Sequence, residues 1–95
     1  MTKLFEVIEN RKIKPEQDSY TNSLLKEGNN KILKKIGEES AEFIMACKDA
    51  ERLSIANEAA DLVFHLQVAL SHNNVSWSDV LRILAERRGA PRRNK

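Results

Sequence analysis

The 95-residue sequence is poor in the residues that cross-link or break a chain, with one cysteine, two prolines and three glycines. A single cysteine excludes an internal disulfide, so we interpret Cys47 as a small core residue. No run approaches the roughly 18 apolar residues that a membrane helix needs, and the first twenty residues contain no signal-peptide pattern. We therefore expect a cytoplasmic protein without a membrane partner.

Strand patterns are also missing, because no segment alternates apolar and polar residues. Apolar residues instead recur at helical spacing, which predicts an all-α bundle of four to five helices. Ser19 (or Asp18), Asn29 or Asn30, Ser54 and Ser76 are plausible N-caps, and Gly28 and Gly89 plausible ends. The expected helices cover about 3–13, 19–28, 30–49, 54–72 and 76–88.

The chain is short for the apolar surface that these helices carry, since 41% of its residues are hydrophobic. A chain of this length buries only about 60–65% of its unfolded surface. Leu33, Ile44 and Cys47 extend the apolar stripe of the long helix, and Leu81 and Leu84 that of the last one. We expect a second copy to cover part of these stripes, so that the bundle is completed in a homodimer.

Positive charge is concentrated at the C-terminus, although the net charge is only +2. Without Arg87, Arg88, Arg92, Arg93 and Lys95, the remainder of the chain carries −3. We expect one domain over residues 1–88 and a basic, disordered tail over 89–95. The alternative is a tail that contacts nucleic acid or substrate phosphates.

Acidic residues line one flank of each of the two long helices. At about 100° per residue, Glu38, Glu39 and Glu42 fall within roughly one third of the first helix, with Lys35 on the same side. In the second helix, Asp61 follows Glu58 by three residues and His65 follows Asp61 by four, which places all three on one face. Carboxylates at the edge of a core would repel one another unless a cation held them together.

The chemical type of these ligands indicates which cation they would bind. Carboxylates without a Cys or His cluster favour a hard divalent ion, and Mg²⁺ commonly shares its shell with substrate phosphates. The metal ligands that we predict are Glu39, Glu42, Glu58 and Asp61. Lys35 and Lys48 could pair with phosphate oxygens. An ordinary solvated face with ion pairs between neighbouring turns is the alternative interpretation.

The residues 38–42 (EESAE) and 58–61 (EAAD) resemble the E-E-x-x-E and E-x-x-D motifs of the all-α, MazG-like nucleotide pyrophosphohydrolases. Further residues, among them 19–21 (SYT), 35–39 (KIGEE) and 60–62 (ADL), resemble the phosphoribosyl-ATP pyrophosphohydrolase family of histidine biosynthesis. The resemblance covers about residues 3–88. Because some relatives are fused to a cyclohydrolase domain and this sequence is short, we expect a stand-alone form.

The resemblance implies hydrolysis of the α–β phosphoanhydride of phosphoribosyl-ATP, which gives phosphoribosyl-AMP and pyrophosphate. It implies that Mg²⁺ neutralises the triphosphate and that Glu38 or Glu39 acts as the catalytic base, the two being equal candidates. Tyr20 and His65 are candidates for substrate contacts. For His65 the alternative is a hydrogen-bonded core histidine.

Two other functions fit the same residues. A related pyrophosphohydrolase that removes unwanted nucleoside triphosphates would keep the acids and change the base pocket. A helical interaction module would instead use the acidic flank to bind a basic partner, with no chemistry. Release of pyrophosphate in the presence of Mg²⁺ separates both enzymes from the module.

Overall fold

Five helices form the part of the chain that the structure describes. The computed structural model describes residues 2–16 and 19–88. Its helices are α1 (Thr2–Ile13), α2 (Tyr20–Glu27), α3 (Asn29–Asp49), α4 (Arg52–His72) and α5 (Trp77–Arg87). Within these residues there is no strand, so the predicted all-α fold is confirmed. The predicted basic tail, residues 89–95, lies outside the described residues.

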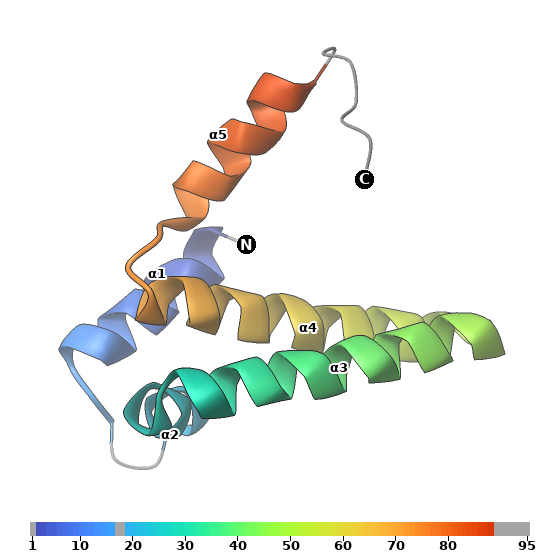
Figure 1. Cartoon of the computed structure of the whole chain (residues 1–95), viewed down its shortest axis with the longest axis horizontal. Coiled ribbons are helices and arrows are strands. Elements are labelled where there is room, and N and C mark those ends of the chain that lie inside the picture. Colours follow the sequence, from blue (N-terminus) through green and yellow to red (C-terminus); the bar gives the residue numbers. More distant parts are fainter. Residues whose placement is uncertain (1, 17–18, 89–95) are drawn as a thin grey trace.

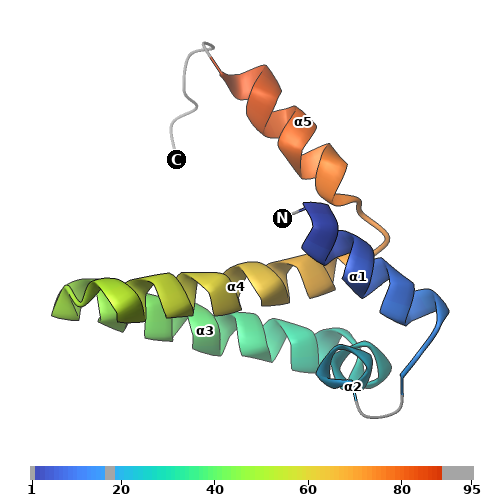
Figure 2. The same ribbon diagram turned by 180° about the vertical axis from the view of Figure 1, so that it is seen from behind.

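The two longest helices, α3 and α4, lie side by side and run in opposite directions (Figures 1 and 2). Each has 21 residues and is therefore about 31 Å long. A tight turn joins them, in which Ala50 adopts the left-handed conformation and donates its N–H to the carbonyls of Ala46 and Cys47. The α3–α4 hairpin is the frame on which the shorter helices are placed.

The core lies at one end of the hairpin, where α1 and α2 pack against it (Figure 1). Each of the first four helices contributes one fully buried apolar side chain, namely Ile8, Leu24, Ile32 and Val68. The opposite end of the hairpin, near the turn, extends beyond α1 and α2 in both views (Figures 1 and 2). One chain therefore buries only part of the apolar surface of α3 and α4.

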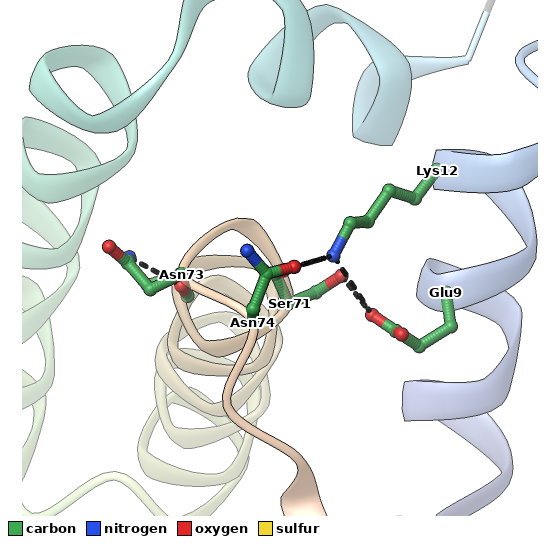
Figure 3. A network of polar contacts seen from close by, with 6 residues as sticks. Glu9, Lys12, Ser71, Asn73 and Asn74 are labelled. Carbon is green, nitrogen blue, oxygen red and sulfur yellow. Dashed lines mark hydrogen bonds and ion pairs between the residues drawn. The ribbon is translucent and has the colours of Figure 1, made fainter.

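Polar contacts fasten α1 to the last turn of α4 (Figure 3). The Lys12 ammonium donates to the carbonyl of Ser71 at 2.6 Å and to the side chain of Asn74 at 2.8 Å. The buried Ser71 hydroxyl donates to the Glu9 carboxylate. The Ser71 carbonyl also accepts from the N–H of Asn74, so the bond from Lys12 gives it a second partner and links α1 to the end of α4.

Two predicted caps are confirmed and two are wrong. Ser19 and Ser76 accept hydrogen bonds from the third residue after them and begin α2 and α5. The helix α4 begins at Arg52, not after Ser54, because the Glu51 carboxylate accepts from the N–H groups of Leu53 and Ser54. A hydrogen bond with the Ser54 side chain, and then these two backbone bonds, lower the pKa of Glu51.

The predicted Asn cap of α3 is wrong because Gly28, with φ 87°, both ends α2 and precedes α3. No side chain caps α3. The Asn29 side chain is used elsewhere, in reciprocal hydrogen bonds with the amide of Asn73. A glycine can turn the chain sharply between two helices because it tolerates positive φ.

Several residues predicted to be buried are exposed in the single chain. Cys47 is exposed, as are Leu33 and Ile44, because neither α1 nor α2 covers that face of α3. In α5 the indole of Trp77 is buried, but Leu81 and Leu84 are exposed. The helix α5 leaves the body at an angle and mainly contacts α1 (Figure 2).

None of the helices in the described ranges is long and apolar enough to cross a membrane.

Substitutions of two isoleucines in α1 test the position of the core. Ile8 is 0% exposed and Ile13 is 75% exposed, so the same substitution removes contacts at only one of them. We expect Ile8→Ala to lower the free energy of unfolding by about 2–5 kcal/mol, and Ile13→Ala to change it by no more than about 0.5 kcal/mol. Urea unfolding monitored by circular dichroism measures both. Equal effects would contradict the position of the core.

Candidate active site

Three of the predicted metal ligands meet between α3 and α4. Glu39 comes from α3, and Glu58 and Asp61 come from α4. One carboxylate oxygen of each lies within 4.8 Å of the other two. The two acidic flanks therefore face each other across the hairpin.

The three carboxylates differ in their exposure to water. The side chain of Glu39 is buried, with 7% of the residue exposed, Glu58 is half-buried, and Asp61 is exposed. Among the residues that the structure describes, the buried Oε2 atoms of Glu39 and Glu58 have no hydrogen-bond partner. A buried carboxylate oxygen without a donor is costly, so these two atoms mark a place for a cation.

The pKa values of Glu39 and Glu58 reflect both burial and the neighbouring carboxylates. Burial raises the pKa of Glu39, and the carboxylates of Glu42 and Asp61 raise it further. Burial also raises the pKa of Glu58, again with contributions from Glu42 and Asp61. Glu42, the fourth predicted ligand, is exposed and is not one of the three that converge within 4.8 Å, but its carboxylate helps to raise the pKa of both Glu39 and Glu58.

Lys35 lies at the edge of the acidic group. Its ammonium is 3.5 Å from Glu38 and 3.7 Å from Glu39, and the pKa of Lys35 is raised chiefly by Tyr20 and then by these two acids. Glu38 is more exposed than Glu39 and lies on the solvent side of this contact.

Lys48 does not join the group. It is exposed and follows Glu39 by nine residues, which is half a turn around the axis of α3. Of the two lysines predicted to bind phosphate, only Lys35 lies beside the acids.

His65 connects the acidic group to α2. Its Nδ1 lies 2.7 Å from the carbonyl oxygen of Asp61, and its Nε2 lies 2.9 Å from the hydroxyl of Tyr20. The imidazole is buried, and the Tyr20 ring stacks on Phe64 at a centroid distance of 6.0 Å. Both ring nitrogens of His65 thus have protein partners, as expected for a hydrogen-bonded core histidine.

The bond between Tyr20 and His65 is a feature that the sequence did not predict. The two residues are 45 positions apart, and no local pattern relates them. Only the packing of α2 against α4 brings the hydroxyl to the imidazole.

The chemistry of the donors fits a hard divalent cation such as Mg²⁺. All the gathered ligand atoms are carboxylate oxygens, the two buried ones lack a donor, and Asp61 leaves one side open to solvent. Mg²⁺ takes a few carboxylates and leaves positions for water or phosphate oxygens. An open acidic site of this kind, built on two antiparallel helices, defines an all-α protein suited to binding a metal-bound polyphosphate.

Comparison with known proteins narrows this class. The model of the phosphoribosyl-ATP pyrophosphohydrolase family matches residues 1–88. The chain therefore belongs to the phosphoribosyl-ATP pyrophosphohydrolase family, as the sequence motifs indicated.

Individual relatives support this assignment. The histidine biosynthesis bifunctional protein HisIE of Prochlorococcus marinus (strain MIT 9313) is 68% identical over 98% of this chain and 42% of its own length. The phosphoribosyl-ATP pyrophosphatase of Bacillus cereus (strain B4264) is 45% identical over 90% of this chain and 80% of its own length. The chain thus spans less than half the length of the bifunctional HisIE protein. It spans most of the length of the Bacillus cereus phosphoribosyl-ATP pyrophosphatase.

The crowding of the acids makes a prediction about stability. Replacing Glu39 by glutamine removes one buried charge and keeps the shape of the side chain. We expect Glu39→Gln to raise the melting temperature of the metal-free protein by a few degrees at pH 7. The raised pKa of Glu39 means that ionisation destabilises the fold as pH rises, so the gain should shrink towards acidic pH.

Glu38→Gln is the matched control, since Glu38 is more exposed and pairs with the same lysine. We expect this variant to melt close to the wild type. Differential scanning calorimetry in the presence of a chelator measures both variants. A Glu39→Gln protein that melts below the wild type at pH 7 would show that the buried charge is already compensated.

Proposed function

We propose that this chain catalyses the Mg²⁺-dependent hydrolysis of phosphoribosyl-ATP to phosphoribosyl-AMP and pyrophosphate, a step of histidine biosynthesis. The observation that carries the proposal is the pair of buried, unpartnered carboxylate oxygens on Glu39 and Glu58, next to Asp61. Membership of the family gives the reaction, and the name of the Bacillus cereus relative agrees with it.

The residues that would hold the cation are Glu39, Glu58 and Asp61, with Glu42 beside them. When bound, Mg²⁺ supplies positive charge that stabilises the charge developing on the leaving pyrophosphate. The buried acids hold their positions because the antiparallel contact of α3 and α4 fixes both backbones. Such a site needs little rearrangement during the reaction, which is the main source of electrostatic catalysis.

Lys35 is the residue that we propose for binding a phosphate group. Its ammonium is only partly buried and is held by two acids from the same helix. A phosphate oxygen can replace or share one of these contacts through a charge-assisted hydrogen bond. Lys48 has no such role in the single chain, because it faces away from the acids.

Glu38 is the better candidate for the general base. It lies on the solvent side of the site, so a water molecule can reach its carboxylate, whereas Glu39 is buried beside the other ligands. A base must reach the proton that it removes, which makes access as important as pKa. Glu39 then remains a ligand, and the two acids that the sequence left equivalent acquire different roles.

We also propose that the protein is a homodimer. Near the hairpin turn, Ile44, Met45 and Leu53 are 58%, 65% and 67% exposed, respectively. They lie on the end of the hairpin that extends beyond α1 and α2 (Figure 1). A second hairpin packed there would complete a four-helix arrangement and cover these side chains.

A cytoplasmic location agrees with this function. Cys47 is free and exposed, which suits a reducing compartment. Pathways that consume nucleotides and phosphorylated sugars operate where those metabolites are made.

The reaction is tested with purified protein and a panel of substrates. We expect pyrophosphate release from phosphoribosyl-ATP with Mg²⁺, none with chelator, and much less from the common nucleoside triphosphates. Glu39→Gln and Asp61→Asn should each lower the rate at least about 100-fold, because each removes a charged ligand.

Glu6→Gln is the control for this experiment, since Glu6 is an exposed acid of α1 outside the site. It should keep wild-type activity. Near-normal turnover by Glu39→Gln or Asp61→Asn would remove the basis for the metal site. Preference for another nucleoside triphosphate would instead favour the related pyrophosphohydrolase activity.

Light scattering tests the dimer. We expect a mass of twice the chain at micromolar concentration, and a shift to monomer in Ile44→Glu, because a charge at a covered apolar position costs several kcal/mol. Ile13→Glu is the control, since Ile13 is exposed and lies on α1, away from the hairpin turn. A monomeric wild-type protein would refute the proposal.

A further inference from the structure

Lys48 lies in the proposed dimer interface rather than at the acids of its own chain. It is exposed in the last turn of α3 and faces away from Glu39. At about 100° per residue, Ile44 and Met45 lie to either side of Lys48 on this face of the helix. These two residues are 58% and 65% exposed, and they belong to the surface that we expect a second copy to cover.

The acidic site has little positive charge beside it in one chain. Among the residues that the structure describes, the ion pairs of this group all involve Lys35, which contacts Glu38 and Glu39. A bound polyphosphate adds further negative charge, and phosphoryl transfer commonly uses cationic side chains as well as metal ions to stabilise it. A second cationic side chain at the phosphates would therefore have to come from outside the set that one chain gathers.

A two-fold axis determines which residues meet across a homodimer. In such an interface, residue i of one copy contacts residue j of the other, and j contacts i. An axis perpendicular to α3 between Ile44 and Met45 makes the two copies of α3 antiparallel and places Lys48 opposite Ala41 of the partner subunit. At 1.5 Å per residue, each of these two residues lies about 5 Å from the axis along the helix.

The position opposite Ala41 is next to the acidic flank of α3. Glu38 precedes Ala41 by three residues and Glu42 follows it directly, and all three are exposed. The small side chain of Ala41 leaves room for the stem of a lysine. Because an ammonium on a flexible four-carbon stem can move several ångströms, Lys48 can extend to the edge of the acidic group of the other copy.

Charge favours the antiparallel arrangement over a parallel one. An axis parallel to α3 would place each Lys48 beside its own copy, and the acids of both chains at the same level. Like charges that face each other across an interface are unfavourable. The antiparallel arrangement instead brings Lys48 to the level of Glu38 and Glu42, so that opposite charges meet.

We propose that Lys48 binds the polyphosphate in the active site of the partner subunit, so that each site of the dimer uses Lys35 from its own chain and Lys48 from the other. The inference rests on the proposed function and on the proposed homodimer. It explains how a lysine that faces away from the acids of its own chain can still bind phosphate. The alternative, that Lys48 is an ordinary solvated residue, predicts that its charge has no effect on hydrolysis.

Substitution of Lys48 tests the need for its charge. Lys48→Met keeps the aliphatic stem and removes the ammonium. We expect this variant to remain a dimer in light scattering and to lose about 10–100-fold in kcat/KM for phosphoribosyl-ATP, the effect of losing one hydrogen bond between charged groups. Lys48→Arg should recover most of the loss, because it restores the positive charge. Unchanged kcat/KM in Lys48→Met would overturn the proposal.

Lys34→Met is the matched control, since Lys34 is an exposed lysine of α3 that lies nearer the other end of the helix. It removes the same charge from the chain and should leave kcat/KM close to the wild-type value. A similar loss in Lys34→Met would show that hydrolysis responds to net charge alone, which would overturn the specific role of Lys48.

A mixed dimer tests whether Lys48 acts on the other subunit. Chains carrying Glu39→Gln and chains carrying Lys48→Met are produced together with two different affinity tags, and dimers that contain both are purified. If Lys48 acts across the interface, one site carries both substitutions and the other carries neither. We then expect about half of the wild-type rate per dimer, although both parent homodimers are impaired.

Action within one chain gives a different result. Each site of the mixed dimer would then carry one of the two substitutions, so the rate should be no higher than that expected from the two parent homodimers. That result would overturn the proposal. A wild-type protein that is monomeric while it hydrolyses phosphoribosyl-ATP at the full rate would overturn it as well.

These outcomes can be distinguished from failure of the proposed function. If the wild type hydrolyses phosphoribosyl-ATP but the mixed dimer recovers no activity, only the role of Lys48 is wrong. If the wild type does not hydrolyse phosphoribosyl-ATP, the proposed function fails, and the inference fails with it.

Discussion

The antiparallel contact between α3 and α4 holds together carboxylates that repel one another. Glu39 is buried against the partner helix, Glu58 and Asp61 approach it from the other side, and Glu42 adds a fourth negative charge nearby. Repulsion among these acids opposes the packing of the two helices. The apolar core at one end of the hairpin, built from Ile8, Leu24, Ile32 and Val68, supplies the stabilisation that offsets it.

The repulsion among the acids and the stabilisation by the apolar core explain why the site and the core occupy different parts of the hairpin. The end near His72 is covered by α1 and α2 and fastened by Lys12 and Ser71. The acids lie further along, where the cover ends and solvent can enter. A carboxylate set placed inside the core would be too costly, and one placed at a free surface would not be fixed in position. The edge of the core provides both support and access.

The sequence predicted those features that depend on rotation about a single helix axis. The spacing of Glu58 and Asp61, the position of Lys35 beside Glu38, and the caps at Ser19 and Ser76 are all local relations, and the structure contains them. The motifs in residues 38–42 and 58–61 also indicated the family. Local patterns were misleading where two signals competed, because the Glu51 carboxylate, three residues before Ser54, caps the N–H groups of Leu53 and Ser54 and so begins the helix earlier.

The sequence by itself thus determined five helices, an acidic flank on each of the two long helices, and a family. The tertiary structure decided which acid is buried, that Lys48 turns away from the site, that Cys47 is exposed, and that Tyr20 meets His65. The physical reason is that residue spacing defines directions around one helix, whereas the approach and relative rotation of two helices depend on how all their side chains pack. A contact between residues 45 positions apart therefore cannot be read from either segment alone.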